Sequence, residues 1–447
     1  MRICPGIAGA ILLTTIAAAP AFSWSNHTML SHPALSGLVE LTDREPVVAQ
    51  SLKSFLLREE KGLEKLLADE EGWARKNMPG YEPRPDNLAF RATGDPKDVL
   101  GRFLQAARLN PGIKPRLYLQ LLPGEKTHGR PVIDPGDLAT LKDTGFMEKS
   151  TYVRLKEGEK IAPLEVLTTA NDEPDYGFDL GLFTDNNTAY GKVYGFGIQP
   201  FGNPNLEYGS QAPFHMGFYH EPKIIYFFAP FLKRTYPEYR IHLFKSLSEY
   251  AFRTGNDYWG WRFMGWGMHY LGDLSMPYHA KPLPGVSALR MIWINLKAML
   301  GFAESKNGAI QLVSNRHTIL EEFQENVLRK AYDDKNPGHP LFQALRNPLE
   351  VLPYGDDFPR RVVAKESAMK SGAVDAQIEK YFPERLISDP SFEASGSKEL
   401  GSLIEYTVER KGRESVDQMT LALADLFKSY GMHIRSYLNA IREASKR

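Results

Sequence analysis

One twelve-residue string constrains the fold of this chain more than any other part of its sequence. It reads HYLGDLSMPYHA and starts at His269, with Asp273 four residues later. On a helix this spacing puts both side chains on one face, about one turn apart. Apolar residues surround the pair, so we expect a buried helix, in which an imidazole and a carboxylate both need partners. Pro277 ends the helix, and His279 follows closely enough to fold back toward the same cavity.

A second pair with the same spacing, His317 and Glu321, occurs further along the chain. Two helices that each present an imidazole and a carboxylate can enclose more than one metal ion. Histidine and carboxylate ligands without thiolate are typical of catalytic rather than structural zinc. Cys4 is the only cysteine, which argues against a disulfide framework, a thiolate zinc site and a cysteine nucleophile.

The N-terminal segment predicts export. Residues 1–23 combine a positive charge at Arg2, an apolar stretch over 7–19 and small residues before a cleavage point after Ser23. We therefore predict a signal peptide over 1–23, a mature chain that begins at Trp24, and a secreted or periplasmic location. An uncleaved N-terminal anchor is the alternative interpretation. Outside this segment no run of 18 apolar residues occurs, which argues against a polytopic membrane protein.

Helical periodicity predicts a mainly α-helical fold. Apolar residues recur at helical spacing over 36–77, 222–256, 258–275, 285–303, 311–333 and 414–444. Segments 79–100 and 110–148 are rich in Pro, Gly and Asp, so we expect loops and short helices there. Residues 171–213 are rich in Gly, Asn and aromatics, which predicts a long structured loop or a hairpin over 193–200.

Charge composition argues against some classes of partner. Lys and Arg together number 54, as do Asp and Glu, so the formal net charge is zero. A strongly basic nucleic-acid-binding arm and an acidic disordered chain are both inconsistent with this balance. The chain also lacks the G-x-S-x-G, H-E-x-x-H, Walker A and G-x-G-x-x-G motifs, so other enzyme classes gain no support.

The string HYLGDLSMPYHA resembles the central motif of the zinc-dependent phospholipase C family, whose fold is shared by the single-strand-specific zinc nucleases. The superfamily pattern His-x3-Asp-x5-His is met by His269, Asp273 and His279. The family also has an N-terminal Trp whose amine and carbonyl bind zinc, and Trp24 takes this place once the signal peptide is removed. His27 fits the histidine expected next.

Other features of the family pattern are met with alternatives. His32 is a weaker substitute for the first histidine. An Asp in a Pro-Asp-Tyr context is matched by Asp175. For the histidine expected before the central motif, the best match is His220 in FYHEP, with His215 as the alternative. The family's last pair, His-x3-Glu or His-x3-Asp, is met by the second helical pair described above.

The resemblance implies three zinc ions and divides nine ligands among them. The sets are Asp175, His220, His269 and Asp273 at the first ion; Trp24, His27 and the bridging Asp273 at the second; and His279, His317 and Glu321 at the third. Two close metal ions lower the pKa of a shared water, which attacks phosphorus in line. Asp175 is also the general base that the family's proposed mechanism implies.

The resemblance covers roughly residues 24–32 and 171–330. It implies one mainly α-helical domain of the zinc-dependent phospholipase C and nuclease type over 24–447. Residues 36–170 are then a large insertion with many loops, because compact members of the family have a much shorter interval here.

Two enzyme interpretations share this metal core. A phospholipase C needs an apolar approach for acyl chains, and residues 288–303 are the candidate lipid contact, with an ordinary core helix as the alternative. A single-strand-specific nuclease needs aromatic faces for base stacking, for which Phe214, Phe218 and Tyr219 are candidates. Residues flanking the central motif are closer to the phospholipase branch, so we expect a phospholipid or membrane surface as the substrate, with nucleic acid as the alternative. A third interpretation is a secreted, non-catalytic binding protein with a zinc-stabilised bundle; no protein partner is predicted.

Overall fold

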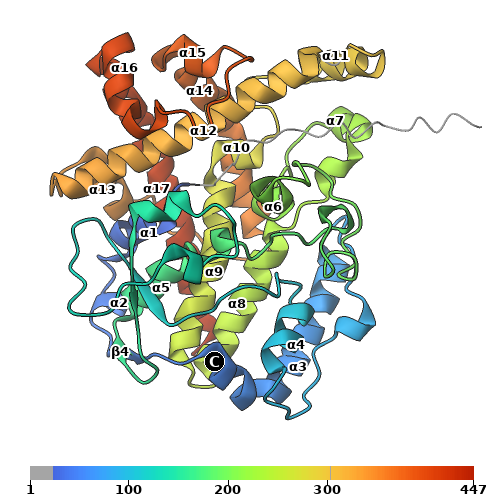
Figure 1. Ribbon diagram of the computed structural model, residues 1–447, viewed down its shortest axis with the longest axis vertical. Helices are drawn as coiled ribbons and strands as arrows, with labels where there is room; N and C mark the ends of the chain where they lie inside the picture. The colour runs from blue at the N-terminus through green and yellow to red at the C-terminus, as the bar shows by residue number, and fades with distance from the viewer. Residues whose placement is uncertain (1–23, 303, 447) are drawn as a thin grey trace, which may run out of the picture.

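The structure is a computed structural model that describes residues 24–302 and 304–446, and it is mainly helical (Figure 1). The predicted signal peptide over 1–23 lies outside the described residues. In chain order the first half contains α1 (His27–Leu35), α2 (Val39–Thr42), β1 (Val47–Val48), α3 (Leu52–Asn77), α4 (Val99–Ala106), β2 (Tyr118–Leu121), β3 (Thr151–Arg154), β4 (Lys160–Ile161), α5 (Pro163–Ala170), the 3-10 helix η4 (Glu173–Tyr176) and α6 (Glu207–His215).

The second half is helical wherever it has regular structure among the described residues. Its elements are α7 (Lys223–Phe228), α8 (Pro237–Arg253), α9 (Asp257–Ser275), α10 (Pro277–Ala280), α11 (Ala288–Met299), α12 (Glu304–Asp333), α13 (Pro340–Arg346), the π-helix η7 (Pro359–Ala364), α14 (Lys365–Tyr381), α15 (Glu384–Ile387), α16 (Leu403–Lys411) and α17 (Arg413–Ala444). Within 24–302 and 304–446, no helix is both long enough and apolar enough to cross a membrane.

Helix α9 is the centre of the fold. It runs beside α8 in the middle of the molecule, and α5 and α17 also pack against it (Figure 1). Every residue from Tyr258 to Ser275 is buried, including Trp259, Trp261 and Trp266. A helix that is apolar on all sides is stable only when other elements surround it. The expectation of a buried helix around the central motif is therefore confirmed.

The end of α9 follows from Pro277. A proline disfavours helical backbone at the residue before it, and Met276 is indeed extended, with φ −83° and ψ 123°. Pro277 then occupies the first turn of α10, where its missing N–H costs no hydrogen bond. The resulting bend turns His279 back toward α9, as the sequence predicts.

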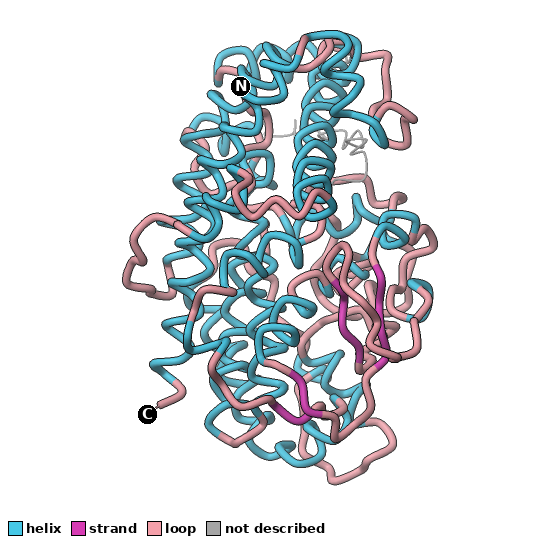
Figure 2. The backbone as a smooth tube through the Cα atoms, turned by 90° about the vertical axis from the view of Figure 1, so that its left-hand side faces the viewer, coloured by secondary structure: helices cyan, strands magenta, loops and turns pink. Residues whose placement is uncertain are grey.

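Residues 36–170 pack onto the same core as the rest of the chain. Helix α3 lies against α4 and α8, and one continuous apolar cluster extends from Trp24 to Ile441. The helix expected over 36–77 is two helices, α2 and α3, with β1 between them. This part of the chain also contains the two small antiparallel ladders of the described structure, β1 with β4 and β2 with β3 (Figure 2). Two-stranded ladders are marginal alone, so packing must support them.

The long loop expected over 171–213 is present, but the hairpin over 193–200 is not. The segment contains η4, a second short 3-10 helix at Thr184–Asn186 and α6, joined by irregular backbone. Gly195 and Gly197 have φ of 80° and 69°, a left-handed conformation that interrupts an extended strand. Helix α6 brings this loop back to α9, which positions its last residue at the site described next.

Candidate metal centre

Three clusters of histidine and carboxylate side chains surround the C-terminal half of α9. In each cluster, one ligand-type atom per residue lies within 4.8 Å of the others. We name them the His27 cluster, the His215 cluster and the His279 cluster. Their members are, respectively, His27, His269 and Asp273; Asp175, His215 and His269; and His279, His317 and Glu321.

Six elements contribute these side chains, and two of the donors are the terminal residues of their helices. His27 begins α1 after Asn26, whose side chain caps the helix by accepting from the Met29 N–H. His215 is the last residue of α6, and Asp175 lies in η4. The remaining donors are on α9, on α10 just after the Pro277 bend, and on α12. Residues distant in sequence thus meet because α9 lies at the centre.

The His215 cluster has the dimensions of a four-coordinate metal site when Asp273 is included. Zinc-type ions lie about 2.0–2.1 Å from nitrogen and oxygen donors, so tetrahedral donors are about 3.3 Å apart. His269 Nε2 is 3.3 Å from His215 Nδ1, 3.4 Å from Asp175 Oδ1 and 3.5 Å from Asp273 Oδ2. His215 Nδ1 is 2.8 Å from Asp273 Oδ2 and 3.8 Å from Asp175 Oδ1. These four donors can hold one metal ion.

Asp273 connects the His215 cluster to the His27 cluster. Its Oδ2 faces His215 and His269, whereas its Oδ1 lies 3.4 Å from His27 Nε2. The rings of His27 and His269 are also close, with centroids 4.2 Å apart. A carboxylate with each oxygen toward a different set of donors is arranged to bridge two cations.

Backbone carbonyls fix the tautomers of two of the histidines. His269 Nδ1 is 2.8 Å from the Asn171 carbonyl, and His279 Nδ1 is 2.8 Å from the His215 carbonyl. A carbonyl oxygen only accepts, so each Nδ1 carries a proton and donates it. Each Nε2 then points into its cluster, which is the arrangement that metal-ligating histidines adopt.

The His279 cluster is a buried carboxylate with two imidazoles beside it. Glu321 Oε1 is 2.7 Å from His317 Nε2 and 3.8 Å from His279 Nε2. Burial, with a contribution from Asp175, raises the pKa of Glu321 well above its ordinary value. Among the described residues, His279 Nε2 is buried and has no hydrogen-bond partner. A buried polar atom of this kind needs a partner, and a divalent cation between His279 and the Glu321 carboxylate would satisfy it.

The imidazoles and carboxylates of the His215 cluster shift one another's pKa values. Burial raises the pKa of Asp273, but His269 and His215 outweigh it and hold that pKa well below its ordinary value. Burial lowers the pKa of His215, whereas Asp179 and Asp273 raise it to about 10. Buried carboxylates therefore require nearby cations here, and a metal ion meets the same requirement.

Asp179 is a candidate functional residue that the sequence alone did not indicate. Its Oδ2 is 3.5 Å from His215 Nε2, on the side of the ring away from the cluster, and it accepts from the Tyr270 hydroxyl at 2.5 Å. Arg240 pairs with its other oxygen at 2.6 Å. A carboxylate behind a ligating histidine orients the ring and raises its basicity. The available signal was an aspartate four residues after Asp175, in EPDYGFD.

Trp24 is buried beside the His27 cluster. Its indole Nε1 donates to Ser275 Oγ at 2.9 Å, and its ring meets the edge of Phe427 with centroids 5.3 Å apart. Ser275 is two residues after Asp273 on α9, so the first described residue packs against the turn that carries the bridging carboxylate. The structure thus places the Trp24 side chain at the end of α9 that carries Asp273.

The prediction of His220 as a ligand needs correction. His220 Nε2 donates to the Arg360 carbonyl at 2.7 Å, and His220 belongs to none of the three clusters. The alternative, His215, occupies the place because α6 ends there against α9, whereas His220 lies beyond in the connection to α7. His32, the substitute for His27, is also outside the clusters; burial and Arg346 lower its pKa to about 4.

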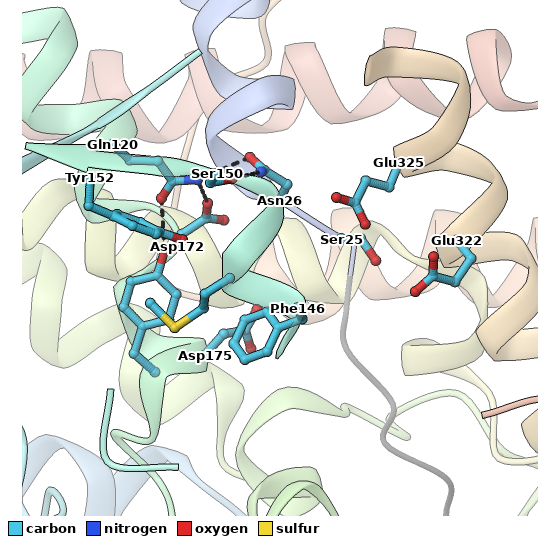
Figure 3. A pocket seen from close by; sticks show the side chains of 12 residues that line it. Ser25, Asn26, Gln120, Phe146, Ser150, Tyr152, Asp172, Asp175, Glu322 and Glu325 are labelled. Carbon is cyan, nitrogen blue, oxygen red and sulfur yellow. Dashed lines mark hydrogen bonds between the residues drawn. The ribbon is translucent and has the colours of Figure 1, made fainter. Parts of the chain in front are cut away.

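A small pocket opens beside Asp175 (Figure 3). Glu322 and Glu325 of α12 lie on one side of it, and Asp172 and Asp175 on the other. Lys149 pairs with both glutamates, at 3.2 and 2.9 Å, and offsets part of this charge. The pocket lining therefore combines four carboxylates with aromatic rings and neutral polar side chains, and it contains no cation among the described residues.

The donor set and its buried, unsatisfied atoms fit a centre for divalent metal ions. Comparisons of the chain with models of known protein families, with curated proteins and with solved structures find no match. The assignment of a function therefore depends on the residues of the centre themselves.

Proposed function

We propose that this chain is an exported, zinc-dependent phosphodiesterase of the phospholipase C type, with the fold that the resemblance of its central motif implies. The observation that carries the proposal is the convergence of three His and carboxylate clusters in which Asp273 faces two. Clusters of imidazole and carboxylate without thiolate favour zinc in a catalytic role. Two ions near one shared carboxylate are typical of phosphoryl-transfer sites.

The proposed ligand set takes His215 in place of His220. Asp175, His215, His269 and Asp273 would hold the first ion, and His279, His317 and Glu321 the third. Bound zinc would supply Lewis acidity toward the phosphoryl oxygens and lower the pKa of water. The chain's own residues orient the reaction: carbonyls and Asp179 fix the imidazoles, and the bridging carboxylate fixes the separation of two sites.

We assign the general base to Asp175. Among the side chains of the His215 cluster it is the most exposed, at 13%, whereas His269 and Asp273 are fully buried. It also lines the pocket, so its carboxylate reaches both the centre and an approaching substrate. This position allows Asp175 to accept a proton from the attacking water.

Two observations favour a phospholipid substrate over a nucleic acid. The pocket is lined by carboxylates, aromatic rings and neutral polar side chains, a lining that repels a polyanionic strand and suits a head group with a positive charge. Phe214 and Phe218, two of the three candidate stacking platforms, are only 0% and 4% exposed. These two rings pack inside the protein instead of presenting a face to a base, and only Tyr219 is partly exposed.

The second ion would be completed by the amine and carbonyl of Trp24 together with His27 and Asp273. An α-amino group binds metal only when it is free and deprotonated, and its ordinary pKa is about 8. Removal of residues 1–23 would therefore create a ligand. This makes the proposed export signal part of the assembly of the centre.

The test is to purify the protein that begins at Trp24 and assay it on phosphatidylcholine vesicles and on single-stranded DNA. Zinc content is measured by mass spectrometry, and each assay is repeated after a chelator. Release of phosphocholine that the chelator abolishes is the expected result. Asp175→Asn, in which an amide oxygen can still face the first ion, should remove most activity, by about a hundredfold or more, while the second and third ions stay bound.

Other outcomes would replace the proposal. Chelator-sensitive release of nucleotides with no release of phosphocholine would assign a nuclease. A protein with three zinc ions and no activity on either substrate would be the non-catalytic binding protein. Equal activity of Asp175→Asn and the unmodified chain would contradict the general-base role.

A further inference from the structure

Helices α7 and α11 carry a cluster of large apolar side chains that are exposed to solvent. Figure 1 shows α11 projecting past the body of the molecule, with α7 close to it, and the two helices are in contact. We call residues 223–234 and 281–302 the α7–α11 tip. Its exposed apolar side chains are Ile224, Phe227, Phe228, Leu289, Trp293, Leu296, Leu300 and Phe302.

The tip is a packed structure and not a loose end. Ile225 and Met291 are buried in one apolar cluster that joins α7 to α11, and Ile292 packs against it. The outer face of the tip is exposed to solvent: Phe227, Leu289 and Leu300 are 75%, 81% and 69% exposed. A contiguous apolar face of this kind on a soluble protein marks an interaction surface.

The charge of the tip identifies its partner. Its two segments contain six cations and no Asp or Glu, although the whole chain has equal numbers of both signs. Lys281 pairs with Glu221 and Arg234 with Glu82. The other four cations, Lys223, Lys233, Arg290 and Lys297, have no carboxylate within 4.0 Å in the described part of the chain.

Two of those cations lie directly beside the apolar face. Lys297 Nζ is 5.4 Å from the centre of the Trp293 ring, and Lys233 Nζ is 5.1 Å from that of Tyr226. Trp, Phe and Leu on one face with Lys and Arg at its margin are the features of a helix that lies in a bilayer interface. Each cation near an anionic surface adds electrostatic attraction to the binding that comes from burying the apolar face.

We propose that the α7–α11 tip docks the protein on a bilayer that contains anionic phospholipid. A second copy of the chain is the less suitable occupant, because a two-fold interface would bring the same unpaired cations face to face. The position of the tip in the chain connects the docking surface to the candidate metal centre. Helix α11 connects α10 to α12, which both carry donors of the His279 cluster, and α7 follows the helix that ends at His215.

The inference does not depend on the proposed hydrolysis, and the test measures binding alone. The unmodified protein is sedimented briefly on ice with vesicles of pure phosphatidylcholine or with added phosphatidylglycerol. We expect binding to the anionic vesicles that weakens at high salt. Replacing Phe227, Trp293 and Leu300 together with Ser should weaken this binding by about tenfold or more, because interfacial affinity scales with buried apolar area.

A matched variant controls for the loss of exposed apolar residues in general. Val39, Val132 and Met369 are 66%, 62% and 76% exposed but lie outside the tip, and replacing all three with Ser should leave vesicle binding unchanged. Arg290→Gln with Lys297→Gln should reduce the preference for anionic vesicles. Melting curves and hydrolysis of a soluble phosphodiester report on folding and on the centre separately.

Two results would overturn the proposal. One is vesicle binding that the Ser variant of the tip retains in full. The other is a dimer in solution that the same variant converts to a monomer, with no binding of the unmodified protein to either vesicle, which would assign the tip to a second copy.

Discussion

Asp273 shows how a single residue organises the centre. Its two oxygens face different donors, and the helical spacing from His269 places both on the buried side of α9. A carboxylate with 0% exposure in a core is costly unless cations surround it. An Asp that follows a His by four residues on an apolar helix therefore needs positively charged partners close by.

His215 and His220 give a direct test of the ligand assignment, because they are close in sequence but differ in position. His215→Gln should lower the zinc content by one ion per chain and reduce activity by about a hundredfold or more, since a direct donor is lost. His220→Gln should leave three ions, because His220 contacts only a backbone carbonyl among the described residues. Zinc content of the two purified variants is the measurement. Loss of zinc in His220→Gln alone would restore the original prediction.

At the scale of elements, α14 holds together the two helices of the His279 cluster. Asp375 of α14 accepts from the Tyr278 hydroxyl at 2.6 Å and pairs with Arg316 at 2.7 Å. Tyr278 precedes His279 on α10, and its ring stacks on His317 of α12, with centroids 5.4 Å apart. The side chains that support His279 and His317 thus both contact the Asp375 carboxylate.

Tyr278→Phe should weaken this support without opening a cavity. We expect the third zinc ion to bind about threefold to tenfold more weakly, because outer-shell hydrogen bonds hold ligands in position. Titration of the protein with a competing chelator measures this loss. Tyr250→Phe, which removes a hydroxyl that donates to Glu59 far from the centre, is the control. Equal affinities in the two variants would show that the Tyr278 hydroxyl does not support the cluster.

The contact between α3 and α8 should make stability depend on pH. His242 of α8 stacks on Trp73 at 3.5 Å between ring centroids and lies 2.7 Å from Glu70. Burial lowers its pKa, but Asp356 and Glu70 outweigh this and raise it to about 9 from 6.5. A histidine with a raised pKa stabilises the folded state fully below pH 6.5, and this contribution disappears as pH rises through about 9.

His242→Gln isolates that contribution. The variant should be less stable than the unmodified protein by about 1–2 kcal/mol at pH 6, a value reduced from the full shift because Asp356 is exposed to solvent. The difference in the free energy of unfolding should shrink above pH 9. Urea unfolding of both proteins from pH 6 to 10 measures it. A difference that stays constant over this range would mean that lost stacking on Trp73, not charge, causes the effect.

The sequence predicted those elements whose local pattern determines their structure. Apolar periodicity and Pro277 together located α9, its end and the return of His279. The strands β1 to β4 were not predicted, because two- to four-residue ladders depend on packing against helices more than on their own residues. The predicted hairpin over 193–200 is absent because Gly195 and Gly197 adopt a left-handed backbone conformation, which composition alone does not reveal.

The structure brings together most of the side chains that the sequence analysis grouped, and it leaves His220 outside the three clusters. The helical pairs on α9 and α12 were identified because i, i+4 spacing fixes their geometry. The choice between His215 and His220 depended on where α6 ends, which is a tertiary property. Asp179 was missed because its role depends on contacts with His215 and Arg240, from other parts of the chain.

At the scale of the whole molecule, a group of ionisable side chains is buried at the centre of the core. Carboxylates and imidazoles from α1, η4, α6, α9, α10 and α12 meet within one apolar cluster that extends from Trp24 to Ile441. With its single cysteine at position 4, the chain beyond residue 23 can form no disulfide within itself. Stability must therefore come from apolar packing and from cations that balance the buried carboxylates.

Removal of metal should consequently destabilise the whole fold. A ligand that binds only the folded state at about a thousand times its Kd contributes about 4 kcal/mol, and three such ions lower Tm on the order of 10 °C when removed from a chain of this size. Calorimetry of the protein before and after a chelator, with zinc content measured in parallel, checks this. Added zinc should restore Tm, whereas Mg²⁺ should not, because imidazole-rich sites bind it poorly. An unchanged Tm after complete loss of zinc would mean that the contacts among the buried imidazoles and carboxylates suffice to balance the charge of the core.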